Sequence, residues 1–347
     1  MGVALDLGTH AARSLRLSKN KTIRRQCRSV ALLIPDGVLA RTRLEQFQVP
    51  FVACDDRLAI PGDPAAEMAE LFGAACQDLL PEGQVPYADP VTRQLIAMLI
   101  ESLIPAASQE GVPCCFSQPG YGQNDEGMED QFDRRLEFVS RVIRLRGYEP
   151  VPINPALALI LAEMETEQFT GVGISVGASG CDLVLSHRGA MLAAARVPRG
   201  GRALDELLAV QARRFCVDSF GQCVLDLEWS RRRREFAAPA QLSSDESQVL
   251  EQALNDLVVE IVLGLDRLLS TSRWESGEPL TIVLGGGLAQ SRAFESRLRK
   301  QIRRAHPGLY PSHIRLAGNA ESAVTRGCLI QSLLEARSQP ALVRIPA

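Results

Sequence analysis

Residues that build metal sites and disulfide frameworks are scarce in this chain. Only 4 of its 347 residues are histidine and 9 are cysteine, and the cysteines are scattered, with no C-x-x-C spacing anywhere. This pattern argues against a zinc site and against the disulfide framework of a secreted domain. We therefore expect the cysteines to be small buried hydrophobic residues and the protein to be cytoplasmic.

Long apolar runs and a strong charge imbalance are also missing. No run approaches the ~18 apolar residues that a membrane-spanning helix needs, and Asp6 interrupts the first apolar stretch, which argues against a signal peptide. With 38 basic and 41 acidic residues the formal net charge is −3, which argues against a general nucleic-acid binder. The length and the 46% hydrophobic content suffice for two cores.

The chain does contain two similar hairpin patterns. "VALDLGTHAARSLRL" (residues 3–17) and "GISVGASGCDLVL" (residues 173–185) each have an apolar run, a loop of small residues and a second alternating run. When Gly8 is aligned with Gly177, Asp6 stands where the second copy has Ser175. Each hairpin is followed by further helices and strands. The repeat therefore predicts two related α/β lobes.

The spacing of apolar residues predicts the elements that follow each hairpin. Asp-Pro starts and helical periodicity predict helices over residues 63–80 and 89–104. An amphipathic pattern predicts a helix closed by Gly147. A long capped helix is expected over residues 243–269, and the stretch "LTIVLGGGLAQ" (residues 280–290) is expected to be a strand that enters a glycine turn. We expect residues 337–347 to form a mobile tail.

Glycine-rich turns of this kind suit phosphate binding. Glycine and other small residues let backbone N–H groups approach phosphate oxygens. A carboxylate just before the turn can hold Mg²⁺ through its water ligands, and a glycine turn at a helix entry can pack closely against a nucleotide. A single turn of this type is more often structural. Several of them in a fixed order favour a nucleotide clamp between two lobes.

In that order the chain resembles the actin-like ATPases, the superfamily of actin, the heat-shock chaperone ATPases and bacterial MreB. "DLGTHAAR" (6–13) and "SVGASGCD" (175–182) are similar to the two phosphate loops, and "RGGRALDE" (199–206) to the stretch after the second. "INPALALILA" (153–162) and "NAESAVTRGCL" (319–329) resemble the two connecting segments, and "IVLGGGLAQSR" (282–292) the adenosine motif. Of these proteins, MreB is the most similar in length and in the motifs "IVLGGG" and "TRGC". The loop "GAS" (177–179), and an arginine at position 13 where related proteins have lysine, resemble the corresponding features of the adaptors FtsA and PilM.

The resemblance implies a two-lobed actin-like fold, with duplicated ribonuclease-H-like subdomains around a central nucleotide cleft. It implies lobe I over residues 1–165 with an inserted subdomain at about 31–84, lobe II over 166–318 with a small subdomain at about 216–275, and a C-terminal helix and tail over 319–347. It implies ATP or ADP with Mg²⁺, which Asp6 would hold through water. The implied nucleotide contacts are Gly8, Thr9, Arg13, Gly177, Ala178, Ser179, Gly200, Gly201, Glu228, Arg231, Gly285, Gly286 and Gly287.

Two positions depart from the family pattern. Ser175 replaces the Asp that normally opens the second phosphate loop, and Asn154 replaces the Glu that polarises the attacking water. A serine hydroxyl adds no charge, and an asparagine can orient a water but cannot accept its proton. Because a missing general base commonly costs ~10²–10⁴-fold in rate, we expect a slow ATPase at most, in which Asp6, Asn154 and Ser175 form the degenerate catalytic set.

Other charged residues have a structural alternative. The run Arg231 to Arg234 could contact a nucleotide or an anionic lipid, but Glu228 and Glu235 flank it, which favours a solvated helix face. For Asp182 and Asp205 we favour structural roles. The segment "PAASQEG" (105–111) contains no large apolar residue, so membrane contact is expected to be peripheral at most.

Three functions are compatible with the resemblance. The first is a bacterial MreB-like cytoskeletal protein, which assembles with itself into filaments and could contact other cell-shape or division proteins. The second is an FtsA- or PilM-like pseudo-ATPase adaptor that does not polymerise. The third is a small-molecule kinase, but the sequence shows no further acid clearly placed as a substrate base. Filament formation separates the first function from the second.

Overall fold

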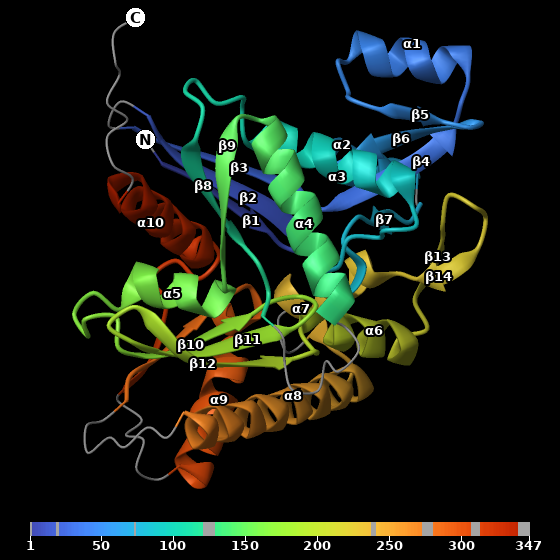
Figure 1. The fold of residues 1–347 in the computed structure, drawn as a ribbon. Coiled ribbons are helices and arrows are strands. Elements are labelled where there is room, and N and C mark those ends of the chain that lie inside the picture. The colour runs from blue at the N-terminus through green and yellow to red at the C-terminus, as the bar shows by residue number, and fades with distance from the viewer. Residues whose placement is uncertain are drawn as a thin grey trace, which may run out of the picture.

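The structure is a computed structural model that describes residues 2–18, 21–72, 74–120, 129–236, 241–272, 280–306 and 313–338. Two five-stranded sheets dominate it, one above the other in Figure 1. The upper sheet has the order β3 (Lys21–Arg28), β2 (Ala11–Ser18), β1 (Gly2–Leu7), β8 (Val112–Ser117), β9 (Tyr148–Ile153). The lower sheet has the order β12 (Ala190–Val197), β11 (Cys181–His187), β10 (Gly171–Val176), β15 (Ile282–Gly285), β16 (Ile314–Leu316).

The two sheets have the same topology. In each, the first three strands along the chain are antiparallel neighbours, and the last two strands run parallel to the first. The repeat read from the two hairpins is therefore a repeat of whole sheets. The expected two-lobed α/β fold is confirmed, whereas the lobe boundaries near residues 165 and 318 stay predictions.

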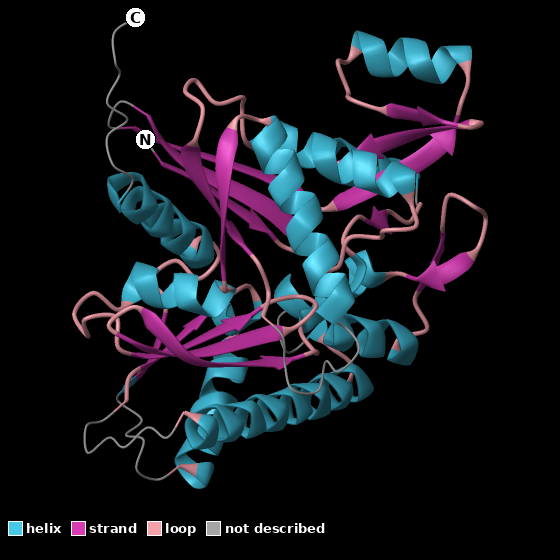
Figure 2. Cartoon of the chain, in the orientation of Figure 1, coloured by secondary structure: helices cyan, strands magenta, loops and turns pink. Residues whose placement is uncertain are grey.

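Helices cover both sheets (Figure 2). Against the upper sheet lie α3 (Pro90–Leu103), which begins at the N-cap Asp89, and α4 (Glu129–Leu145). The lower sheet contacts α8 (Ser244–Thr271), whose predicted capping box forms between Ser243 and Glu246, and α8 in turn contacts α6 (Gly201–Gln211) and α9 (Arg292–Ala305). Each lobe thus has its own apolar core.

Two helices lie between the sheets. α5 (Pro155–Glu163) and α10 (Ala323–Ser338) pack against each other and against both sheets (Figure 1). Their crossing is close, because a Cβ built on Gly327 would lie 1.7 Å from the carbonyl oxygen of Ala158. These helices therefore form part of the packing between the two lobes.

Smaller units extend one end of each lobe. In the upper lobe a four-stranded sheet has the order β5 (Val52–Cys54), β6 (Arg57–Pro61), β4 (Val30–Pro35), β7 (Gln77–Asp78), with α1 (Val38–Gln46) and α2 (Asp63–Phe72). In the lower lobe β13 (Phe215–Val217) and β14 (Cys223–Leu225) form a hairpin before α7 (Leu227–Phe236).

One predicted helix is shorter than expected. The sequence predicted a helix over residues 63–80, but α2 ends at Phe72 and Gln77–Asp78 form strand β7. The pairing of Val30 with Asp78 extends the small sheet, so tertiary hydrogen bonding overrides the local periodicity. Within the described residues no helix is long and apolar enough to span a bilayer. The expected tail lies largely outside the described residues, which end at residue 338.

Candidate functional site

A cavity of about 1490 Å³ lies where the two lobes face each other. Residues of both hairpins, of α6 and α7 and of the glycine turn line it. Three of the residues predicted for the site do not line it, namely Asn154, Gly200 and Gly285. The predicted site residues that do line it are Asp6, Gly8, Thr9, Arg13, Ser175, Gly177, Ala178, Ser179, Gly201, Glu228, Arg231, Gly286 and Gly287.

The first hairpin presents its acid at the end of β1. Asp6 pairs across the hairpin with Arg13, and the Ser117 hydroxyl at the end of β8 donates to Asp6 Oδ1 over 2.7 Å. A Cβ on Gly8 would lie 2.7 Å from the carbonyl oxygen of Ala11, so the tight turn requires glycine. The carboxylate is therefore held at the mouth of the turn, on the cavity side.

In the second hairpin the acid stands on the opposite strand. The pairing of Ser175 with Asp182 is equivalent to the pairing of Asp6 with Arg13. Asp182 is only 5% exposed. It accepts hydrogen bonds from Arg196 Nη1 over 3.1 Å and from the Gly120 amide of the upper lobe over 3.0 Å. The acid missing at Ser175 is thus present seven residues later, already neutralised by an arginine.

The tips of the two hairpins meet across the cavity. The Thr9 hydroxyl donates to Ser179 Oγ over 3.0 Å. Behind the second tip, the Gly201 amide donates to the carbonyl of Gly177 over 3.0 Å, and a Cβ on Gly200 would lie 2.4 Å from that same oxygen. Gly200 therefore allows the close approach of α6 to the loop.

The third glycine turn continues β15 beside the second hairpin. Gly286 has a φ of +94°, and a Cβ there would lie 2.2 Å from the carbonyl oxygen of Val176. Gly285 packs against Leu159 of α5, whereas nothing lies within 4 Å of a Cβ built on Gly287. Only Gly286 and Gly287 face the cavity, with Gly287 the open position.

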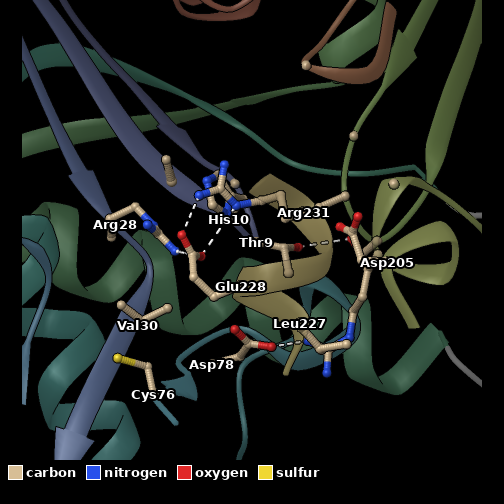
Figure 3. Close-up of a pocket in the computed structure, with 18 of the residues that line it drawn as sticks. Thr9, His10, Arg28, Val30, Cys76, Asp78, Asp205, Leu227, Glu228 and Arg231 are labelled. Atoms are coloured by element: carbon tan, nitrogen blue, oxygen red, sulfur yellow. Dashed lines mark hydrogen bonds and ion pairs between the residues drawn. The ribbon is translucent and has the colours of Figure 1, made fainter. Parts of the chain in front are cut away.

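Acidic partners neutralise the arginine run on α7. Glu228 bonds Arg231 over 2.6 Å and Arg28 of β3 over 2.7 Å, so this carboxylate joins the two lobes (Figure 3). Burial alone raises the pKa of Glu228, but hydrogen bonds from Arg231 and Arg28 outweigh it and lower the pKa to about 2. The other three arginines are also paired, in Arg232–Glu70, Arg233–Glu246 and Arg234–Asp205. The run is therefore ion-paired and partly buried along the cavity wall and does not form the expected solvated face, while the roles of Arg231 and Asp205 stay predictions.

His10 lies within the first phosphate loop and beside this network (Figure 3). Burial is the largest cause that lowers its pKa, and the charges of Arg231 and Arg28 add to the effect, so that the pKa is about 3. A neutral imidazole therefore lies among cations on the cavity wall.

Asn154 has a different environment from the other predicted residues. It is the N-cap of α5, and its side-chain oxygen accepts from the Ala156 amide over 2.8 Å. A Cβ on Gly120 would lie 2.7 Å from Asn154 Nδ2, so this side chain packs under the loop after β8. The geometry gives Asn154 a capping role.

Sequence reasoning missed several residues of the site. Ser117 is the last residue of the buried strand β8, at the carboxyl ends of parallel strands, a position that often carries function. Arg135 lies on the apolar face of α4, three residues after Phe132 and four before Val139. A charged residue on the apolar face of a predicted helix could have been recognised from the sequence as a candidate for function. Arg28 and Arg196 gave no local signal, because their partners are distant in sequence.

No three His, Cys, Asp or Glu side chains gather into a metal-binding group within the ranges that the structure describes. The Ser117 hydroxyl bonds the Asp6 carboxylate, and Ser175 lines the same cavity from the other lobe. One carboxylate with neighbouring hydroxyls fits an ion such as Mg²⁺ that keeps most of its water, and does not fit a fully protein-bound ion.

Comparison with known proteins places this geometry in context. A family model described as Volactin matches residues 1–332, and no curated protein matches the chain. A MamK double helical filament structure is similar, with 15% identity, a TM-score of 0.68, and coverage of 97% of this chain and 99% of that chain. MreB 5 of Spiroplasma citri bound to AMPPNP has 14% identity, a TM-score of 0.64, and 96% of each chain covered. EutJ from Carboxydothermus hydrogenoformans has 12% identity, a TM-score of 0.51, and 95% and 89% covered. The actin-like ATPase fold is therefore confirmed.

Proposed function

The chain belongs to the Volactin family, and from this premise we propose that it is an actin-like cytoskeletal protein that binds ATP with Mg²⁺ between its lobes and assembles into filaments. The observation that carries the proposal is the convergence of three glycine turns, from segments far apart in sequence, on one cavity. Structures of similar fold include a MamK filament and an AMPPNP-bound MreB, which supports the same function here.

The residues present fit a nucleotide. The turns at Gly8 and Gly177 offer backbone N–H groups to phosphates, and Arg13 adds a cation on the cavity wall. Gly287 leaves open space in the turn that would pass under the adenosine. Bound Mg²⁺ would neutralise phosphate charge, with Asp6 holding its water ligands. Gly201, Glu228 and Arg231 would complete the contacts, while Gly200 and Gly285 would shape the loops.

We also propose slow hydrolysis and the domain division expected above. Ser175 supplies no charge, and Asn154 is engaged in capping α5. This capping role favours a second candidate, an adaptor that keeps ATP as a structural ligand. The two sheets and the helices between them are consistent with lobes that divide near residue 165, with the C-terminal helix returning to lobe I.

Calorimetry with Mg²⁺-ATP tests nucleotide binding. The wild type is expected to bind, and both Asp6→Ala and Gly286→Asp are expected to weaken binding strongly, because one removes the ligand for Mg²⁺ water and the other places a side chain against Val176. The matched control is Gly37→Ala, at a position of extended backbone where a Cβ meets nothing. Tight binding that neither substitution changes would contradict the proposed site.

A further inference from the structure

Two buried arginines from opposite lobes end at the floor of the cavity. Arg135 lies on α4 of the upper lobe and is 2% exposed, and Arg196 lies on β12 of the lower lobe and is 8% exposed. Both line the cavity next to the hairpins. Neither arginine was among the nucleotide contacts predicted from the sequence.

The guanidinium of Arg135 has no carboxylate partner among the described residues. Its Nη2 donates to the carbonyls of Leu7 over 2.9 Å and of Ser117 over 3.5 Å, and its Nη1 donates to the carbonyl of Gly83. Its Nε has no hydrogen-bond partner in the described structure. A buried cation that bonds only neutral carbonyls is costly unless anions lie nearby. Asp6 and Asp182 are near enough to act on its charge, but neither forms an ion pair with it among the described residues. These carbonyls hold the Arg135 guanidinium against the first phosphate loop and the end of β8.

Arg196 reaches the same floor from below. Its Nη1 pairs with Asp182, and its Nη2 lies 2.8 Å from a Cβ built on Gly180, so it rests on the second phosphate loop. Its guanidinium also lies 5.5 Å from the ring centroid of Phe132, one turn before Arg135 on α4. Burial lowers the pKa of Arg135 to about 10, and the charge of Arg196 contributes in the same direction, while the charges of Asp6 and Asp182 act against both. The two cations thus repel each other across the boundary between the lobes, and the two carboxylates offset part of that repulsion.

We propose that Arg135 and Arg196 bind the terminal phosphate of a nucleoside triphosphate, one from each lobe. The inference rests on the proposed nucleotide site and names the groups that distinguish ATP from ADP there. A third phosphate between the two loops would give Arg135 an anionic partner and would add a second anionic partner to Arg196, which already pairs with Asp182. This assignment also accounts for Ser175, because the two arginines would supply part of the positive charge that Mg²⁺, held by a second acid, would otherwise bring to the phosphate.

The test is calorimetric affinity for ATP and for ADP, measured with Mg²⁺ on the full chain. The wild type is expected to bind ATP at least about 10-fold more tightly than ADP, since one charge-assisted hydrogen bond suffices for that ratio. Asp182→Asn with Arg196→Gln removes the ion pair without leaving a lone charge. Arg135→Met removes the other cation. Each is expected to abolish most of the ATP preference and to leave ADP affinity within about twofold.

The control is Arg202→Gln, which changes another cavity-lining arginine, paired with Asp78 and Glu206 and part of the α6 wall. It should leave the ATP-to-ADP ratio unchanged. Retained ADP binding shows that a variant is folded; if Arg135→Met does not fold, Arg135→Lys replaces it and should lose part of the ratio. Equal wild-type affinities for ATP and ADP, or parallel losses in the variants, would overturn this inference alone. If the wild type binds neither nucleotide, the proposed function fails and the inference fails with it.

Discussion

The two hairpins use the same backbone with different charges. In the first, Asp6 faces Arg13 across the strands, and in the second, Ser175 faces Asp182. In each sheet the residue on the second strand also bonds a residue on the third strand. Arg13 Nε donates to Gln26 in the upper sheet, and Asp182 accepts from Arg196 in the lower sheet. The duplication therefore conserves geometry, while the chemistry of the two loops has diverged.

Hydrolysis is expected to be slow because of Ser175 and Asn154. Steady-state phosphate release should fall well below typical enzyme turnover of about 10 per second. Ser175→Asp, alone or with Asn154→Glu, is expected to raise the rate, because Ser175 lines the cavity and a carboxylate there can hold Mg²⁺ through water. A phosphate-release assay with matched protein concentrations checks this. A fast wild type that Ser175→Asp slows would show that Ser175 has been given the wrong role.

His10 is expected to make stability depend on pH. Its pKa is about 3 in the folded protein and about 6.5 when unfolded, so the unfolded chain binds the proton first as pH falls. The stability that a neutral His10 contributes is complete above pH 6.5 and is lost towards pH 3, at up to about 1.4 kcal/mol per pH unit.

Urea unfolding between pH 5 and 7 measures this slope, above the range in which carboxylates titrate. His10→Asn should flatten it, and His187→Asn, an exposed position at the end of β11, is the control. Equal slopes for the wild type and His10→Asn would exclude this role of His10.

The sequence could predict the glycines and the first acid of the site, because a turn and its preceding acid are adjacent in the chain. It could not predict Arg28 or Arg196. Arg28 finds its carboxylate 200 residues away, and Gly120 reaches Asp182 from the other lobe. Such partners depend on how the lobes pack, which local patterns do not encode.

Among the helices, the α5–α10 crossing depends on one glycine. Gly327→Ala would force a Cβ to 1.7 Å from the carbonyl oxygen of Ala158, which is backbone and cannot turn aside. We expect destabilisation of about 3 kcal/mol or loss of folding. The matched control is Gly264→Ala in α8, where the nearest atom is a Val197 side-chain carbon at 3.4 Å.

Because alanine favours the helix interior by about 0.5–1 kcal/mol over glycine, Gly264→Ala should be neutral or stabilising. Thermal and urea unfolding compare the two variants. Similar stabilities for Gly327→Ala and the wild type would mean that the helices can separate without cost.

Element prediction succeeded where the signal is local. The Asp89 cap, the Ser243 capping box and the Gly147 stop all lie within one helix and its ends. The helix expected over 63–80 was wrong beyond Phe72, because residues 77–78 pair with β4, a contact that periodicity cannot reveal.

Across the whole molecule, ion pairs join the outer parts of the two lobes. Arg28–Glu228, Arg232–Glu70 and Arg202–Asp78 each link an upper-lobe residue to α6 or α7. In the proposed function the nucleotide would enter and leave between these elements. We therefore expect Arg28→Gln to speed nucleotide release several-fold and to reduce the extent to which salt accelerates release.

Stopped-flow release of a fluorescent nucleotide at several ionic strengths measures both effects. Arg41→Gln is the control, because its partner Asp36 lies in the same small subdomain. Release that is independent of salt in the wild type would argue against a gate of ion pairs.

The central claim is nucleotide-dependent assembly, since ATP that joins the lobes would preorganise contact surfaces through its higher affinity for the closed form. The most direct measurement is sedimentation with negative-stain imaging over about 1–50 μM protein, a range in which exposed patches self-associate, with ATP, ADP or no nucleotide. The account predicts filaments that form with ATP and persist, because hydrolysis is slow. Protein that stays monomeric by light scattering in every condition, lipid vesicles included, would contradict it and favour the adaptor function.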